Sequence, residues 1–224
     1  DTLSLHDALP ILAPDQPNLR EVVTDGSTGL LFARENAEAL AVQLGRCVRD
    51  RAFAARVGAS MAERALALTH PGDSLLLIAG RGHNGDDVRA MLPHLGGRVV
   101  KLIEVLEPEK ALPEITLALA SRPALVVDGL FGIGLNRPLT DAWVELIARL
   151  NQSGARVLAV DVPSGLNADT GEPQPVAVQA ALTVTIGAPK CGLLTGRAAT
   201  YVGQLEVAAE VGLIPCPGHG EQQW

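Results

Sequence analysis

Short, continuous apolar runs recur from residue 74 onward, and a turn and a helical pattern follow most of them. The runs are Leu75 to Ala79, Val99 to Ile103, Ala124 to Val127, Val157 to Val160 and Leu182 to Ile186. A strand that lacks polar alternation is typically buried on both faces, as in a parallel sheet covered by helices. The sequence therefore predicts a doubly wound α/β fold, with a mainly parallel, Rossmann-like sheet and helices on both faces.

The helices between these strands are expected at Asp87 to Leu95, Pro113 to Ala120 and Asp141 to Asn151. In the last of them Trp143, Leu146, Ile147 and Leu150 fall on one face, which indicates packing against the sheet. Ligands of such folds bind beyond the carboxyl ends of the strands.

Composition limits the kind of ligand. The chain has 224 residues, a formal net charge of −7 and only 3% aromatic residues. An acidic chain with few aromatic side chains is a poor candidate for binding nucleic acid, so we expect a small-molecule ligand. Its apolar runs are too short to cross a membrane, and its three cysteines have neither disulfide nor zinc spacing. We expect a cytoplasmic protein without membrane contact, and we allow for a homodimer.

The first seventy residues differ from the rest, and we expect a domain boundary at THPGD, Thr69 to Asp73. Asn36 is a candidate N-cap for one helix, and a second is expected from Arg51 to Leu68. The stretch PNLREVVTDGSTGLLF and these helices resemble the end of double-Rossmann glycosyltransferases over residues 12–68, without that family's sugar-binding glutamate motif. We expect a helical segment of this kind at residues 12–70. Residues 1–11 resemble a translated sequencing adapter, the alternative being a genuine extension, and residues 216–224 are expected to be a disordered tail.

Three polar loops begin where predicted strands end. They are GRGHNGDD at Gly80 to Asp87, VVDGLFGIGLNRPL at Val126 to Leu139, and VDVPSG at Val160 to Gly165. Because the carboxyl ends of parallel strands share one edge, the three loops predict a single site. The first loop also fits GxGxxG, and Glu104 stands 24 residues after Gly80, so a dinucleotide-dependent dehydrogenase and a ligand-free tight turn both remain open.

Four motifs in order, these loops together with LTVTIGAPKCGLLTG, resemble the NAD(P)H-hydrate epimerases over residues 74–214. The resemblance implies an isomerase domain at residues 72–215 that interconverts the epimers of NADH or NADPH hydrated at C6, a metabolite-repair reaction. The family's helices before the first strand are expected to be missing here. A non-catalytic nucleotide-binding or interaction module is the third alternative.

The resemblance also implies site residues. Potassium ligands would be Asn84, Asp128 and Ser164, each of which offers the oxygen donor that a hard cation prefers. Substrate-binding positions would be His83, Asn84, Gly85, Asp86, Asp87, Gly132, Ile133, Gly134, Leu135, Asn136, Arg137, Pro138 and Asp161. Lys190 in the GAPK turn is a further candidate to contact phosphate.

Epimerisation at a carbon that carries a hydroxyl and a ring nitrogen needs loss and return of water, and therefore acid–base help. Asp161 is the expected catalytic residue, and Asp128 is second because a bound cation would make it a poor acid. The structural alternatives are a turn-capping Asp161 and surface positions for Arg137 and Lys190. His83, Asp86 and Val88 depart from the family's usual NNGGDG pattern.

Overall fold

The computed structural model describes residues 11–21, 29–36, 51–135 and 137–208, which divide into two compact units. The first lies within residues 1–53 and 209–224, and its described part is a small parallel sheet. Strand β1 (Ile11–Pro14) pairs with β2 (Gly29–Phe32), and the one-turn helix α1 (Pro17–Arg20) lies between them in sequence. The segment expected to be helical therefore also contains a sheet.

Some predictions fall outside these residues. The helix expected after Asn36 falls on residues 37–50, and the tail expected at residues 216–224 lies beyond residue 208. The adapter-like stretch at residues 1–11 also lies outside the described residues, except for Ile11. They stay predictions.

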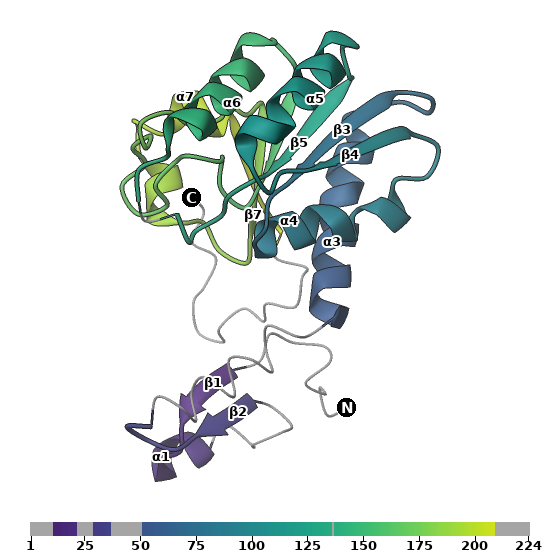
Figure 1. Ribbon diagram of the computed structural model, residues 1–224. Helices are drawn as coiled ribbons and strands as arrows, with labels where there is room; N and C mark the ends of the chain where they lie inside the picture. Colours follow the sequence, from purple (N-terminus) through teal and green to yellow (C-terminus); the bar gives the residue numbers. More distant parts are fainter. Residues whose placement is uncertain (1–10, 22–28, 37–50, 136, 209–224) are drawn as a thin grey trace. The chain divides into compact units, whose positions relative to one another are not determined.

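The second unit, Ala54–Ala208, contains a six-stranded sheet in the order β4-β3-β5-β6-β7-β8. Figure 1 labels β3, β4, β5 and β7 of this sheet. All five strand pairs are parallel, which confirms the predicted sheet. The strands are β3 (Ser74–Ala79), β4 (Val99–Glu104), β5 (Leu125–Gly129), β6 (Val157–Val160), β7 (Leu182–Ile186) and β8 (Gln204–Ala208). The chain leaves β3 toward β4 on one side and then returns to β5 on the other. The carboxyl ends of β3 and β5 therefore flank the switch point at which such sheets bind ligands.

Helices cover both faces of this sheet, as predicted (Figure 1). Leu76 and Ile78 of β3 belong to a buried cluster that includes residues of α5 (Pro108–Ala120) and α6 (Asp141–Gln152). Side chains alternate along a strand, so Leu75 and Leu77 face the opposite side. That side is covered by α4 (His83–Ala90), which packs against β3, β5 and β6.

Two of these helices begin earlier than predicted. Helix α4 begins at His83 and ends at Ala90, because Gly82 in extended backbone already serves as its N-cap, and η1 (Leu92–His94) follows. Helix α5 begins at Pro108 because proline suits the first turn of a helix, and Pro113, the expected start, lies inside it. The remaining short elements are η2 (Cys191–Leu194) and α7 (Ala199–Val202).

Helix α3 (Arg51–Ala67) contributes to the second unit, whose boundary lies at residue 54 rather than near Thr69. Gly58 packs so closely on α4 that an added Cβ would lie 2.4 Å from the carbonyl carbon of Ala90. The Arg98 guanidinium donates to the Leu66 carbonyl at 3.2 Å, and Met61 is fully buried. Helix α3, expected from Arg51 to Leu68, therefore precedes β3 and packs on this unit, whereas the expectation that the family's own helices are missing here stays a prediction.

Candidate functional site

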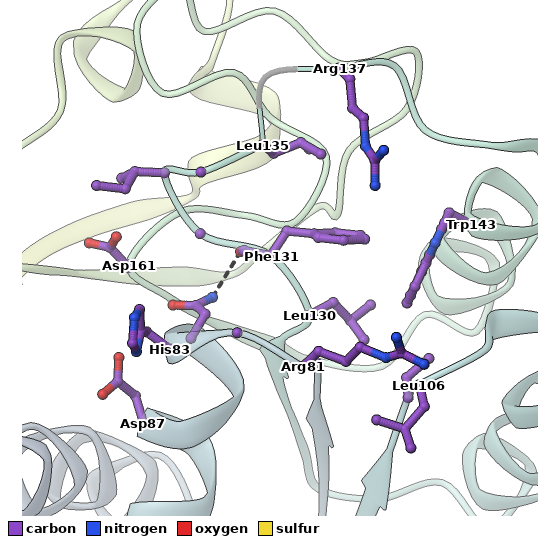
Figure 2. Close-up of a pocket in the computed structure, with 17 residues that line it drawn as sticks. Arg81, His83, Asp87, Leu106, Leu130, Phe131, Leu135, Arg137, Trp143 and Asp161 are labelled. Carbon is purple, nitrogen blue, oxygen red and sulfur yellow. Dashed lines mark hydrogen bonds between the residues drawn. The ribbon is translucent and has the colours of Figure 1, made fainter. Parts of the chain in front are cut away.

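A cavity of about 700 Å³ opens at the carboxyl edge of the sheet (Figure 2). Its walls come from the loops that follow β3, β4, β5 and β6, from the first residues of α4 and from the first turn of α6. Nine of the predicted substrate-binding residues line it: His83, Asn84, Asp87, Gly132, Ile133, Gly134, Leu135, Arg137 and Asp161. The loops that the sequence predicted to converge do form one site.

Two glycines allow the loop after β3 to enter α4 against its neighbours. A Cβ on Gly80 would lie 2.1 Å from the carbonyl oxygen of Leu130, and one on Gly85 would lie 2.0 Å from the carbonyl oxygen of Gly80. Both positions therefore require glycine for close backbone packing. Gly82 has open space around it and lies in the cavity wall, so the loop still presents free backbone to a ligand.

Asp161, at the end of β6, has a left-handed backbone with φ of +66°. Its Oδ1 accepts hydrogen bonds from Ile186 N at 3.0 Å and Thr185 Oγ1 at 3.2 Å, and it also pairs with Lys190 Nζ. Among the described residues none donates to Oδ2, and the carboxyl group faces the cavity (Figure 2). Asp161 is thus anchored through one oxygen, and the other is available to a ligand.

Lys190 does not lie in the lining of the cavity. Its ammonium group donates to Thr185 Oγ1 at 3.0 Å and to the Ile186 carbonyl at 2.9 Å as well as to Asp161. Lys190 therefore acts on Asp161 by fixing its position, rather than as a surface cation.

Two of the predicted potassium ligands, Asn84 and Ser164, bond to the backbone of Phe131, and the third, Asp128, bonds to Ser164. Asn84 Nδ2 donates to the Phe131 carbonyl at 2.8 Å and to that of Val160 at 2.9 Å. The Phe131 amide donates to Ser164 Oγ at 2.9 Å, and Ser164 Oγ donates to Asp128 Oδ1 at 2.6 Å. The amide, hydroxyl and carboxyl groups thus belong to one hydrogen-bonded cluster beneath the cavity.

Asp128 is fully buried at the end of β5. Desolvation raises the pKa of its carboxyl group, while hydrogen bonds from Ser164 and from Leu130 N act in the opposite direction. Within the described part of the chain, none of its hydrogen-bond partners is a cationic side chain. A hard cation beside this carboxylate would offset its burial, and the Ser164 hydroxyl offers a further oxygen, whereas the Asn84 amide presents its N–H₂ group to the cluster.

Asp87 lines the cavity from α4, on the same side as Asp161 and His83 (Figure 2). Burial is the largest cause that raises the pKa of its carboxyl group to about 7, and the charges of Asp161 and Asp86 raise it further. This site therefore contains two acidic groups that are near enough to interact.

The other side of the cavity is apolar and cationic. The sequence predicted Arg137 for the site, but not Phe131, Trp143, Leu106 or Arg81. The rings of Phe131 and Trp143 meet edge to face, with centroids 4.7 Å apart. Leu106 and the guanidinium groups of Arg81 and Arg137 complete this side (Figure 2). Arg81 lies between two glycines of the first loop, and this position is a sequence signal for a side chain at the site.

Four predicted binding residues lie outside the lining, namely Gly85, Asp86, Pro138 and Lys190, and Asn136 lies outside the described residues. Asp86 is exposed and pairs with Arg89 at 2.9 Å. The same arginine pairs with Glu104 at 2.7 Å, so the acid that suggested a ribose-binding site is not in the cavity wall.

A Rossmann-like α/β sheet with an acidic and cationic cavity at its switch point defines a class of small-molecule-binding proteins. Residues 90–192 match the family described as YjeF-related protein N-terminus. A Limosilactobacillus fermentum protein named NAD(P)H-hydrate epimerase is 38% identical over 174 residues, covering 69% of this chain and 84% of the relative. The chain belongs to the NAD(P)H-hydrate epimerase family.

Other relatives agree with this assignment. A Limosilactobacillus reuteri protein of the same name is 35% identical, covering 62% of this chain and 74% of that protein. A Pyrobaculum aerophilum protein named bifunctional NAD(P)H-hydrate repair enzyme Nnr is 34% identical, and the match covers 36% of its length. The crystal structure of yeast ynu0 has a TM-score of 0.54 at 22% identity, covering 75% of this chain and 84% of that chain, which shows the shared fold.

Proposed function

We propose that this protein is an isomerase that interconverts the R and S epimers of hydrated NADH or NADPH. The observation that carries the proposal is Asp161, whose carboxyl group is anchored at Oδ1 and faces the cavity with Oδ2 available. Support also comes from the 38% identity with a protein named NAD(P)H-hydrate epimerase.

The reaction inverts one carbon, C6 of the hydrated nicotinamide ring. Protonation of the C6 hydroxyl lets it leave as water, while the electron pair of the ring nitrogen forms an iminium-like C6. Water then adds from the opposite face and loses a proton. Asp161 supports this chemistry as an acid–base group, since general acid–base catalysis contributes about 10²- to 10⁴-fold.

The nucleotide would span the cavity. Arg81 and Arg137 are suited to the phosphate groups, because a guanidinium presents several donors to phosphate oxygens. The apolar wall of Phe131 and Trp143 is suited to a flat ring, since aromatic side chains pack edge to face or offset with such rings. The hydrated ring would then lie toward Asp161.

Potassium is the expected cofactor, held by Asn84, Asp128 and Ser164 together with the Phe131 carbonyl. In the present geometry the Asn84 amide directs its N–H₂ group at that carbonyl. Rotation of the amide would direct Asn84 Oδ1 toward the Phe131 carbonyl oxygen instead. A cation between these two oxygens would stabilise that arrangement. Bound in this way, potassium would neutralise the buried carboxylate and fix the loop after β5, which forms one wall of the cavity.

The test is to incubate the purified chain with the R epimer of hydrated NADPH and follow the S epimer by chromatography. Parallel samples contain potassium or choline chloride at equal ionic strength, and a sample without protein measures the spontaneous rate. We expect the S epimer to accumulate faster with protein, and faster again with potassium. A rate equal to the protein-free sample would contradict the proposed activity, and equal rates in the two salts would contradict the potassium site.

The dehydrogenase alternative receives no support from Glu104, which pairs with Arg89 outside the lining. A binding module without turnover would bind the hydrated nucleotide but not convert it. The same assay therefore distinguishes a binding module from an epimerase. No helix in the described parts of the chain is long and apolar enough to cross a membrane. A cytoplasmic location and a homodimer stay predictions.

A further inference from the structure

Inversion at C6 places two demands on the site. The leaving hydroxyl and the entering water lie on opposite faces of the ring, and a single carboxyl group cannot contact both at once. One group must therefore deliver a proton on one face while another receives a proton on the other face, unless bulk water serves. The cavity contains a second carboxyl group, Asp87, that the sequence assigned only to substrate binding.

Asp87 and Asp161 approach the cavity from different elements. Asp87 lies one turn into α4, and Asp161 follows β6. Both line the cavity, and Figure 2 shows their carboxyl groups apart from one another, with the exposed side chain of His83 between them. We propose that Asp87 and Asp161 form a two-carboxyl acid–base pair, in which Asp87 protonates the C6 hydroxyl and Asp161 receives the proton of the entering water. This inference rests on the proposed epimerase function.

The step balances in atoms and electrons. The proton of Asp87 passes to the C6 hydroxyl, the C6–O bond breaks with its electron pair on water, and the ring nitrogen forms a double bond to C6. A second water adds to C6 from the other face, that double bond returns its electrons to nitrogen, and the proton of the water passes to Asp161. The reverse reaction begins from this state with the roles exchanged, and proton exchange with solvent or with His83 resets the pair.

The surroundings of the two groups differ in a way that suits these roles. Lys190, Thr185 and the Ile186 amide all donate to Asp161, so its carboxyl group is held in place as an acceptor. For Asp87 the electrostatic influences are acidic, from Asp161 and Asp86. Burial and these charges raise the pKa of Asp87 to about 7, so an appreciable part of the protein carries the proton at neutral pH.

The charged and titratable groups around Asp87 lie on several elements. Helix α3, which packs on α4 at Gly58, carries Arg56, Glu63 and Arg64, and Arg81 lies in the loop after β3. Helix α4 itself carries His83, Asp86 and Arg89, and Arg89 is engaged by Asp86 and Glu104. The strand ends contribute Asp161 from β6 and the buried Asp128 from β5, whereas η1 contributes only the exposed His94. Among the described residues the basic side chains of α4, His83 and Arg89, pair with Asp86 and Glu104 rather than with Asp87, whose carboxyl group lines the cavity.

The experiment compares Asp87→Asn with the unmodified chain and with Asp169→Asn, a matched control at an exposed loop carboxylate. Rates are measured from the R and the S epimer by chromatography, with thermal melting of each variant. We expect Asp87→Asn to lower kcat about 100-fold or more in both directions with KM within about threefold, and Asp169→Asn to leave both unchanged. The unmodified chain should lose kcat as the pH rises above 7.

Other results would overturn the proposal. A kcat for Asp87→Asn within about threefold of the unmodified value shows that the Asp87 proton is not used. Asp87→Glu separates chemistry from packing, because it keeps the carboxyl group and should retain more kcat than Asp87→Asn. Equal losses in these two variants would assign Asp87 to packing. No epimerisation by the unmodified chain would refute the proposed function itself, whereas activity that survives in Asp87→Asn refutes only the role of Asp87.

Discussion

Asp87→Asn should stabilise the fold at alkaline pH. In the folded protein the pKa of Asp87 is raised from 3.8 to about 7, so the folded state binds this proton more tightly than the unfolded chain. The stability linked to the proton is complete below pH 4 and is lost as the pH rises through 7. A difference of about three pKa units, at about 1.4 kcal/mol each, limits the stability lost when Asp87 ionises to about 4 kcal/mol. Because Asp87 adjoins an open cavity, we expect about 2 kcal/mol.

Thermal melting between pH 4 and pH 9 measures this effect. At pH 8 the melting temperature of Asp87→Asn should exceed that of the unmodified chain by about 4 to 8 °C, on a scale of about 2 to 4 °C per kcal/mol for this size. At pH 4 the two should converge. Asp128 also has a raised pKa, but it is present in both proteins and cancels in the difference. Parallel melting curves for the two proteins at every pH would refute the reasoning, and Asp169→Asn should follow the unmodified chain.

Three further predictions concern the site wall and the packing around it. Arg81→Ala should raise KM about 10- to 100-fold with little change in kcat, because charge-assisted hydrogen bonds to phosphate would be lost. An equal rise in KM for hydrated NADH and hydrated NADPH would indicate that Arg81 binds the pyrophosphate, which both nucleotides contain. Gly85→Ala should cost about 1 to 3 kcal/mol of unfolding free energy by denaturant titration, because its Cβ would meet the Gly80 carbonyl oxygen at 2.0 Å. Met61→Ala should cost about 2 to 5 kcal/mol in the same measurement, whereas no loss would mean that α3 is not part of the folded unit.

The strands were predictable because their environment is simple. Runs such as Leu75 to Ala79 are buried on both faces, so continuous apolar sequence identifies them directly. Strand β8 lies at the sheet edge, and two residues of its sequence QLEVA are polar, so the same rule misses it. Helix α3 was assigned to a separate segment because its sequence resembles another family, and only contacts such as Gly58 with Ala90 show where it packs.

The candidate site was predictable in its position and in part of its composition. Loops that follow neighbouring parallel strands must share an edge, which brought Asn84 and Asp161 together. Trp143 was assigned to the packed face of its helix, and it does pack there, but its ring also closes the cavity. Lys190 could not be placed, because its contact with Asp161 depends on the path of the chain after β7. Long-range side-chain geometry of this kind leaves no local pattern in the sequence.

The central claim is that the cavity epimerises C6 by loss and return of water beside Asp161. The most direct measurement is epimerisation of the pure R form of hydrated NADPH in ¹⁸O-labelled water, with mass spectrometry of the separated epimers. Because the departing water remains on the first face, each S molecule formed by the protein should carry the label at C6, and Asp161→Asn should form almost none. Catalysed conversion that leaves the original oxygen in the S epimer, or full conversion by Asp161→Asn, would contradict the account.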